Sequence, residues 1–277
     1  MPIPDTYQAD LQQLLDKRHD NGADYWATPD GRWGKGSPFS TFDCALMLHE
    51  LGMKRTDPVL KGVAEVIRGN WREDGRFRSA PKATLYPCHT ANATRVLCRI
   101  GYARDRRLKR TFEHLLETQH VDGGWRCNSV KLGRGFETDA SNPGVTLSTL
   151  DAFRFTDHLN NDERLTEAVE TVLDHWTIKR PMGPCSFGIG TLFGQVEYPF
   201  RRYNLFFYVY VLSFYEAARK SPMFREAFAA LEERVVDGKV VVENPNRRLA
   251  RLALCERGKP SRLATKRYRE ILKNLAG

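Results

Sequence analysis

The sequence lacks a hydrophobic run long enough to cross a bilayer. Its longest apolar stretch, Leu205 to Leu212, has eight residues, whereas a membrane-spanning helix needs about twenty. The first residues also lack the basic-then-apolar order of a secretory signal peptide. We therefore expect no membrane span and a cytoplasmic location.

The chain also lacks Cys-x-x-Cys pairs, Pro-rich runs and low-complexity linkers. Six cysteines in 277 residues, without a secretion signal, predict reduced thiols rather than a disulfide framework. Because no break in composition divides the chain, we expect one domain over residues 1–277. A hydrophobic content of 41% is ample for a buried core in a chain of this length.

Acidic residues are too few to balance the basic ones, and the formal net charge is +9. Such a balance favours an anionic partner, which could be nucleic acid, a membrane surface or a phosphorylated metabolite. Net charge alone does not choose among the three.

What the chain does contain is a repeated Asp-Gly-x-aromatic motif. The strongest copy lies within Gln119–Trp125, and others are Asp30–Trp33, Asp74–Phe77 and a weaker Asp237–Val240. The first three copies begin at residues 30, 74 and 122, and spacing of this kind indicates a repeat architecture. Asp-Gly allows a tight turn with positive φ, and the aromatic residue can wedge between neighbouring helices.

Helical periodicity follows the same repeat. Amphipathic helices are expected near residues 5–19, 57–67, 108–116, 165–176 and 222–231, each followed by a loop and a second helix. The second helices are expected near 41–51, 88–100, from 142, 203–218 and 260–275, and several are apolar on all sides. Amphipathic helices suit an outer ring and apolar ones an inner ring. The sequence therefore predicts an all-α fold, an α/α toroid of about five helical hairpins whose inner-helix N-termini meet at one mouth.

The Gln-x-x-Asp-Gly-Gly-Trp motif of Gln119–Trp125, repeated between helices, resembles the repeats of terpene cyclases and protein prenyltransferase β subunits. The chain is most similar to small stand-alone prenyltransferase-like toroid proteins. The resemblance implies a transferase or cyclase that acts on, or binds, an isoprenoid diphosphate or a related anionic lipid in the barrel.

The catalytic signatures of these families are mostly absent. The sequence has no Asp-x-Asp-Asp and no Asp-Asp-x-x-Asp motif. Prenyltransferase β subunits bind zinc through an Asp-x-Cys pair and a distant His-Thr. Here Asp43 and Cys44 are adjacent, and His89-Thr90 begins an inner helix. The resemblance thus offers Asp43 and His89 as catalytic candidates, with a departure in the first.

A third catalytic candidate is Glu197, which stands beside nine aromatic residues between Tyr198 and Tyr215. The aromatic side chains could line a prenyl pocket or fill the core, and core filling is the more common role. Glu197 could act as an acid or base, or pair with Arg201 and Arg202. We favour the pairing.

Four cysteines occupy equivalent loops between an outer and the next inner helix: Cys88, Cys127, Cys185 and Cys255. If they meet at the mouth they could bind zinc tetrahedrally, with His89 as a substitute ligand. Buried free cysteines are also common core residues, and Cys88 at a helix N-terminus could instead be a reactive thiol.

The mouth loops are basic, and we expect an anion site there formed by Arg76, Arg126, Lys131, Arg201 and Arg202. Inner-helix N-termini would add N–H donors and partial positive charge at the same end. A prenyl diphosphate or another anionic lipid-like ligand would suit such a site. The alternative is a solvated basic rim.

Three functions are compatible with these features. One is an enzyme on isoprenoid diphosphates; another is a non-catalytic scaffold whose Cys-rich metal site holds the loops and whose basic rim binds a protein or anionic partner. The last is a thiol- or metal-dependent enzyme of other chemistry. The basic loops lack interleaved aromatic residues as stacking platforms, which argues against nucleic acid as the partner.

Overall fold

The structure is a computed structural model that describes residues 3–127, 139–183 and 188–277. Within these ranges nearly all regular structure is helical, and the strands are confined to one short antiparallel hairpin, β1 (Val235–Val236) and β2 (Lys239–Val240). The prediction of an all-α chain is confirmed. Among the described helices, none combines the length and the apolar character that a bilayer span requires.

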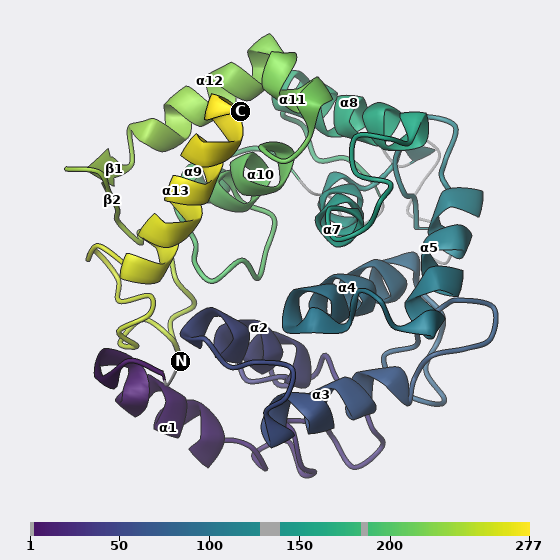
Figure 1. Cartoon of the computed structure of the whole chain (residues 1–277), viewed down its shortest axis with the longest axis vertical. Coiled ribbons are helices and arrows are strands. Elements are labelled where there is room, and N and C mark those ends of the chain that lie inside the picture. Colours follow the sequence, from purple (N-terminus) through teal and green to yellow (C-terminus); the bar gives the residue numbers. More distant parts are fainter. Residues whose placement is uncertain (1–2, 128–138, 184–187) are drawn as a thin grey trace.

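The longer helices alternate along the chain between the periphery and the centre of the molecule (Figure 1). The peripheral helices are α1 (Gln8–Asp16), α3 (Pro58–Arg68), α5 (Arg106–Glu117), α8 (Glu163–Ile178) and α12 (Pro222–Glu232). Nearer the centre lie α2 (Thr41–Leu51), α4 (Pro87–Leu97), α7 (Pro143–Phe153) and α10 (Leu205–Leu212). A last helix, α13 (Arg262–Ala276), packs on α10 and β2. Consecutive central helices contact each other, from α2 through α4 and α7 to α10.

Local sequence explains where these helices begin. The N-cap side chains accept a backbone N–H of the first turn at α2, α3, α5, α7, α8, α10, α12 and α13, which satisfies donors that a helix leaves free. Proline stands in the first turn of α3, α4, α7 and α12, where its missing N–H costs nothing. Gly52 ends α2 with φ of 106°, the left-handed conformation expected of a C-terminal glycine.

The three Asp-Gly motifs form the same turn. In each, the glycine N–H donates to the carbonyl three residues earlier, at Thr28, Arg72 and His120 respectively. The N–H of that earlier residue donates to the carbonyl four residues further on. All three glycines have positive φ, between 72° and 88°. The motif copies seen in the sequence are therefore structural repeats.

A second bond ties the turns of the second and third copies to the helix that follows each. The N–H groups of Phe77 and Trp125 donate to threonine hydroxyls in the first turns of α4 and α7, at 3.1 Å in both cases. The weak fourth copy keeps the same bond, because the Val240 N–H donates to the Thr265 hydroxyl of α13 at 3.0 Å. Helix α13 is therefore linked to the turn before it by the same kind of bond as α4 and α7.

The motif aromatics are buried at the predicted junctions. Trp33 is 4% exposed, Phe77 0% and Trp125 2%. The Trp125 indole N–H donates to the Leu115 carbonyl of α5 at 2.8 Å, and its ring stacks on Phe153 of α7. The Trp125 ring therefore joins the peripheral helix α5 to the central helix α7.

Other elements are shorter than the sequence pattern indicates. The helix expected over 203–218 is divided into α10 and α11 (Glu216–Lys220). Asn160 fixes the break, since its amide donates to the Phe214 carbonyl and accepts the Glu216 N–H. The remaining short elements are η1 (Asp5–Tyr7), a π-helical turn η2 (Cys98–Tyr102) and α9 (Thr191–Gly194).

The first and last parts of the described chain are joined by buried polar contacts. The Asp10 carboxylate of α1 accepts the backbone N–H groups of Ala253 and Leu254 at 3.0 and 2.8 Å. Glu50 of α2 pairs with Arg267 of α13 at 2.9 Å. These contacts bring α1 and α2 against the C-terminal region.

The centre of the molecule is filled by a charged cluster. The Asp151 carboxylate on α7 accepts hydrogen bonds from Arg95 of α4 at 2.7 Å, from Arg99 of η2 at 2.6 and 2.9 Å, and from Arg154 at 2.7 Å. Asp151 is fully buried, and the Arg95 and Arg99 side chains are 2% exposed. Arg95 also donates to the carbonyl of Phe200, in the loop that precedes α10. That loop therefore reaches across the centre to α4.

Candidate functional site

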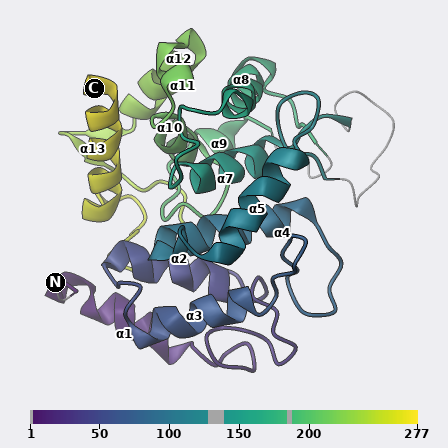
Figure 2. The same ribbon diagram turned by 45° about the vertical axis from the view of Figure 1, so that its right-hand side comes forward.

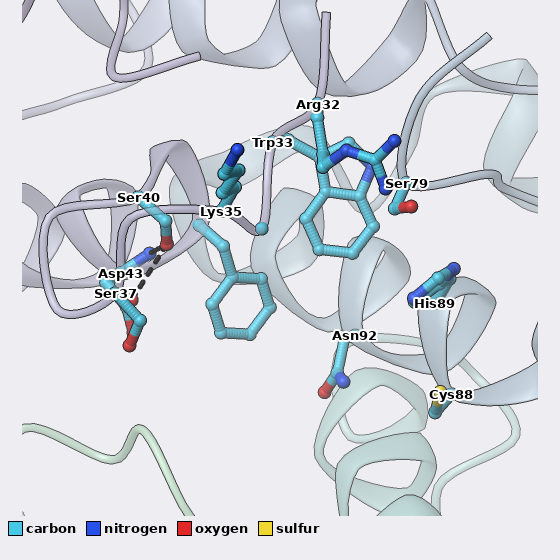
Figure 3. A pocket seen from close by; sticks show the side chains of 12 residues that line it. Arg32, Trp33, Lys35, Ser37, Ser40, Asp43, Ser79, Cys88, His89 and Asn92 are labelled. Carbon is cyan, nitrogen blue, oxygen red and sulfur yellow. Dashed lines mark hydrogen bonds between the residues drawn. The ribbon is translucent and has the colours of Figure 1, made fainter. Parts of the chain in front are cut away.

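A pocket of about 460 Å³ lies between the first turns of α2 and α4. Figure 3 shows its side chains facing a common space. The loop after α1 contributes Arg32, Trp33 and Lys35, while α4 contributes Cys88, His89 and Asn92. Hydroxyl groups of Ser37, Ser40 and Ser79 complete the polar lining, together with Asp43. We call this space the mouth pocket.

Trp33 sets the shape of the mouth pocket. Its backbone N–H donates to the Ser79 carbonyl at 3.1 Å, and its indole N–H donates to the Arg78 carbonyl at 2.7 Å. The ring stacks on Phe42 with centroids 5.9 Å apart and meets His89 edge-on at 5.7 Å. The first Asp-Gly turn thus provides an aromatic wall fixed to the loop of the second repeat.

His89 is held as a neutral imidazole in the mouth pocket. Burial, and after it the positive charge of Arg32, lower the pKa of His89 below its ordinary value. Its ring packs edge-on against Tyr86 as well as Trp33. In the described part of the chain, its buried Nδ1 has no hydrogen-bond partner. This buried nitrogen therefore has an unused hydrogen-bonding capacity beside the mouth pocket.

Asp43 is oriented by the N-cap of its own helix and neutralised by an arginine in the loop before α10. Its N–H donates to the Ser40 hydroxyl at 3.1 Å, and that hydroxyl donates back to the carboxylate at 2.8 Å. The Arg201 guanidinium donates to Asp43 at 2.7 Å and to the Ser37 hydroxyl at 2.6 Å. The Arg201 side chain is 3% exposed, so its charge is used within the protein.

Glu197 pairs with the two arginines that follow it, the role favoured from the sequence. Its carboxylate lies 3.6 Å from Arg201 Nη1 and 4.0 Å from Arg202 Nε. Burial nevertheless raises the pKa of Glu197; Arg202 and Arg201 offset this in part, and Asp43 adds to it. Asp43, Glu197, Arg201 and Arg202 are therefore brought together beside the mouth pocket, ahead of α10.

Because its pKa is raised on folding, Glu197 favours the folded state most when it is neutral, and this contribution is lost as pH rises through the folded pKa. We expect Glu197→Gln to match the wild type below about pH 4, the ordinary range of the Glu pKa, and to become relatively more stable toward neutral pH. Thermal unfolding across this range measures the difference. The exposed Glu73→Gln variant is the control, and a Glu197→Gln variant that loses stability as pH rises would contradict the prediction.

The other predicted basic residues lie elsewhere. Arg76 and Arg126 line a separate, smaller pocket of about 140 Å³ on the other side of the first turn of α4. Arg76 pairs with Asp74 at 2.8 Å, and Arg126 pairs with Asp139. Lys131 lies outside the described residues. Anion binding by these side chains stays a prediction.

The predicted metal centre is described only in part. Cys88 is half-buried at the mouth pocket, while Cys127 and Cys255 are buried and are free thiols. Burial raises the pKa of the Cys255 thiol to about 12, and its Sγ contacts the Leu249 carbonyl. Over the described ranges, no group of three or more His, Cys, Asp or Glu side chains could hold a metal. Cys185 lies outside those ranges, so the zinc site stays a prediction.

Sequence reasoning missed two features of this region. Arg32 and Lys35 of the mouth pocket were not singled out, although Arg32 belongs to the first Asp-Gly motif. The buried Arg95, Arg99 and Asp151 were also missed. Charged residues within otherwise apolar helices were the available signal for these three, because a buried charge requires a partner.

Comparison with known protein families finds no match to this chain, and comparison with curated proteins finds none either.

Proposed function

We propose that the chain is an α/α toroid of five helical hairpins that binds a small phosphorylated ligand in the mouth pocket. The toroid is supported by the shared Asp-Gly turns, by the threonine bonds that link α4, α7 and α13 to the turns before them, and by the contacts that join α1 and α2 to the C-terminal region.

The observation that carries the binding proposal is the charge of the mouth pocket. Lys35 is exposed and makes no ion pair within the described residues, and Arg32 pairs only with the exposed Asp30 at 3.2 Å. The carboxylate of Asp43 is compensated by Arg201, so it repels an anion weakly. The first turns of α2 and α4 meet at the pocket, and helix N-termini favour negative charge.

The dimensions of the mouth pocket limit the size of the ligand and the depth at which it binds. Its volume of about 460 Å³ suits a small molecule, and Trp33 and Phe42 give it an aromatic wall. Because the loop before α10 and the Asp151 cluster fill the centre, the ligand is held at the mouth rather than deep between the helices. A prenyl diphosphate with a short chain is the ligand that the family resemblance implies.

Titration calorimetry with pyrophosphate and geranyl diphosphate tests the proposal. We expect both to bind, and we expect Arg32→Gln and Lys35→Gln each to weaken binding about tenfold, because a hydrogen bond to a charged group contributes about 1.5–3 kcal/mol. Lys61→Gln removes an exposed charge from the peripheral helix α3 and should leave affinity unchanged.

Tighter binding of geranyl diphosphate than of pyrophosphate would place the prenyl chain on the aromatic wall. Equal affinities would limit recognition to the phosphates. Absence of binding for both at low salt, where electrostatic attraction is strongest, would overturn the proposal.

A scaffold without a small-molecule ligand is the second candidate. The filled centre favours it, since Arg95 joins α4 to both α7 and the loop before α10, which is an arrangement that braces the helices. This candidate predicts that neither pyrophosphate nor geranyl diphosphate binds, and that Arg32→Gln and Lys35→Gln leave the stability unchanged.

A further inference from the structure

The excess positive charge of the chain is concentrated at its C-terminal end. Residues 244–277 contain ten Lys or Arg residues and two Glu residues. They therefore account for +8 of the net charge of +9. None of this excess belongs to the mouth pocket, whose lining residues all precede residue 93.

Helix α13 displays much of this charge along one side. Arg262, Lys266, Arg269 and Lys273 follow each other at intervals of four, three and four residues and are all exposed. Such spacing places side chains on one face of a helix. In the part of the chain that the structure describes, these four side chains make no ion pair. Figure 2 shows α13 at the edge of the molecule.

A groove of about 760 Å³ runs beside this face. Arg262, Lys266 and Arg269 line it together with Lys239 of β2, and among the described residues that line the groove none is acidic. Ser261 caps the first turn of α13 at the same place, so the positive end of the helix dipole adds to the field. Four cations without a carboxylate form a surface complementary to a row of phosphates.

We infer that the groove and the basic face of α13 bind the phosphate backbone of duplex nucleic acid. The distance along the helix from Arg262 to Lys273 is about 16 Å, which spans several nucleotides of a strand that rises about 3.4 Å per nucleotide. Contacts of this kind hold the backbone and carry no sequence information directly. The expected binding is therefore independent of sequence.

The burial of the aromatic side chains at the groove favours duplex over single-stranded nucleic acid as the partner. Tyr7 at the groove is 4% exposed and Tyr268 of α13 is 7% exposed, so no ring is available for stacking on bases. Single-strand binding relies on such stacking, whereas a duplex presents its phosphates without it. The sequence argument against nucleic acid rested on missing stacking platforms and does not apply to a duplex.

Burial of the apolar face disfavours a membrane surface. Ala264, Tyr268 and Ile271 of α13 are buried in the protein. A helix that lies in a bilayer interface must insert a row of apolar side chains, whereas α13 exposes one large apolar side chain, Leu272, which is 40% exposed. A phosphate backbone requires only the exposed cations.

Fluorescence anisotropy with a labelled DNA duplex of about 20 base pairs tests the inference at salt concentrations between about 50 and 200 mM. With about four phosphates neutralised, the logarithm of the binding constant should fall with the logarithm of salt with a slope of about −4. We expect Lys266→Glu/Arg269→Glu to weaken binding at least tenfold and to bring the slope to about −2.

Matched controls separate the groove from net charge. Lys61→Glu/Lys109→Glu makes the same change in charge on exposed residues of α3 and α5 and should change affinity less than twofold. Equal losses in the two double variants would overturn the inference, as would tighter binding to a single strand or binding only to phosphatidylserine vesicles. Circular dichroism establishes that both variants are folded, and both should still bind pyrophosphate at the mouth pocket.

Discussion

Asp151→Asn is expected to destabilise the protein by about 3–5 kcal/mol, the usual cost of removing one partner from a buried ion pair. The side chain is fully buried and bonds to Arg95, Arg99 and Arg154. The variant leaves these guanidinium groups without their shared countercharge in a region that water does not reach. Since native proteins are stable by about 5–15 kcal/mol, this is a large part of the total stability.

The pH dependence follows from the same contacts. Although burial alone would raise it, the Arg99, Arg154 and Arg95 guanidinium groups hold the pKa of Asp151 well below its usual range. The stabilisation is present in full above the unfolded pKa of about 4 and is lost as pH falls toward the folded pKa. Urea unfolding at several pH values should therefore show the gap between variant and wild type narrowing in acid.

The control for Asp151 is the exposed Asp157, which makes no ion pair within the described residues. Asp157→Asn should change stability by less than about 0.5 kcal/mol, as is usual at the surface. If Asp151→Asn were as mild as this control, the cluster would not hold the central helices together.

Trp125→Ala should cost about 3–5 kcal/mol, the range for truncating a large buried aromatic side chain. The ring is 2% exposed and stacks on Phe153 of α7. The alanine variant leaves a cavity where α5 and α7 meet. Urea unfolding, with the slope compared between variant and wild type, measures the loss.

Trp125→Phe separates packing from hydrogen bonding. It keeps most of the ring but leaves the buried Leu115 carbonyl without its indole donor, so we expect a smaller loss of about 1–3 kcal/mol. A loss below 1 kcal/mol for Trp125→Ala would show that this ring does not wedge the repeats together.

Much of the fold follows from local sequence. The helix expected over 41–51 is observed as Thr41–Leu51, because a serine N-cap and a C-terminal glycine mark its two ends. The Asp-Gly motifs predicted three equivalent turns, since positive φ at glycine is a local property. The break between α10 and α11 was missed because Asn160, more than fifty residues away, determines it.

The sequence predicted individual residues of the candidate site but not the contacts between them. The sequence singled out each of Asp43, Glu197, Arg201 and Arg202. It did not predict that they meet, because the bond from Arg201 to Asp43 links the loop before α10 to α2 across 158 positions. Pairing over such a separation depends on the packing of all intervening helices. His89 was a candidate because of the resemblance to prenyltransferase β subunits. The effect of Arg32, which adds to burial in lowering the pKa of His89, depends on the packing of the first repeat against the second and could not be predicted from the sequence.

The bonds of Asp10 to Ala253 and Leu254 have a consequence for the order of events during synthesis. A ribosome adds about 5–20 residues per second, so α1 emerges on the order of ten seconds or more before the backbone groups that its carboxylate accepts. The delay between the synthesis of Glu50 and that of its partner Arg267 is almost as long. The nascent N-terminal segment therefore keeps these carboxylates hydrated until residues 253–267 have emerged, and α1 and α2 can form these contacts only then.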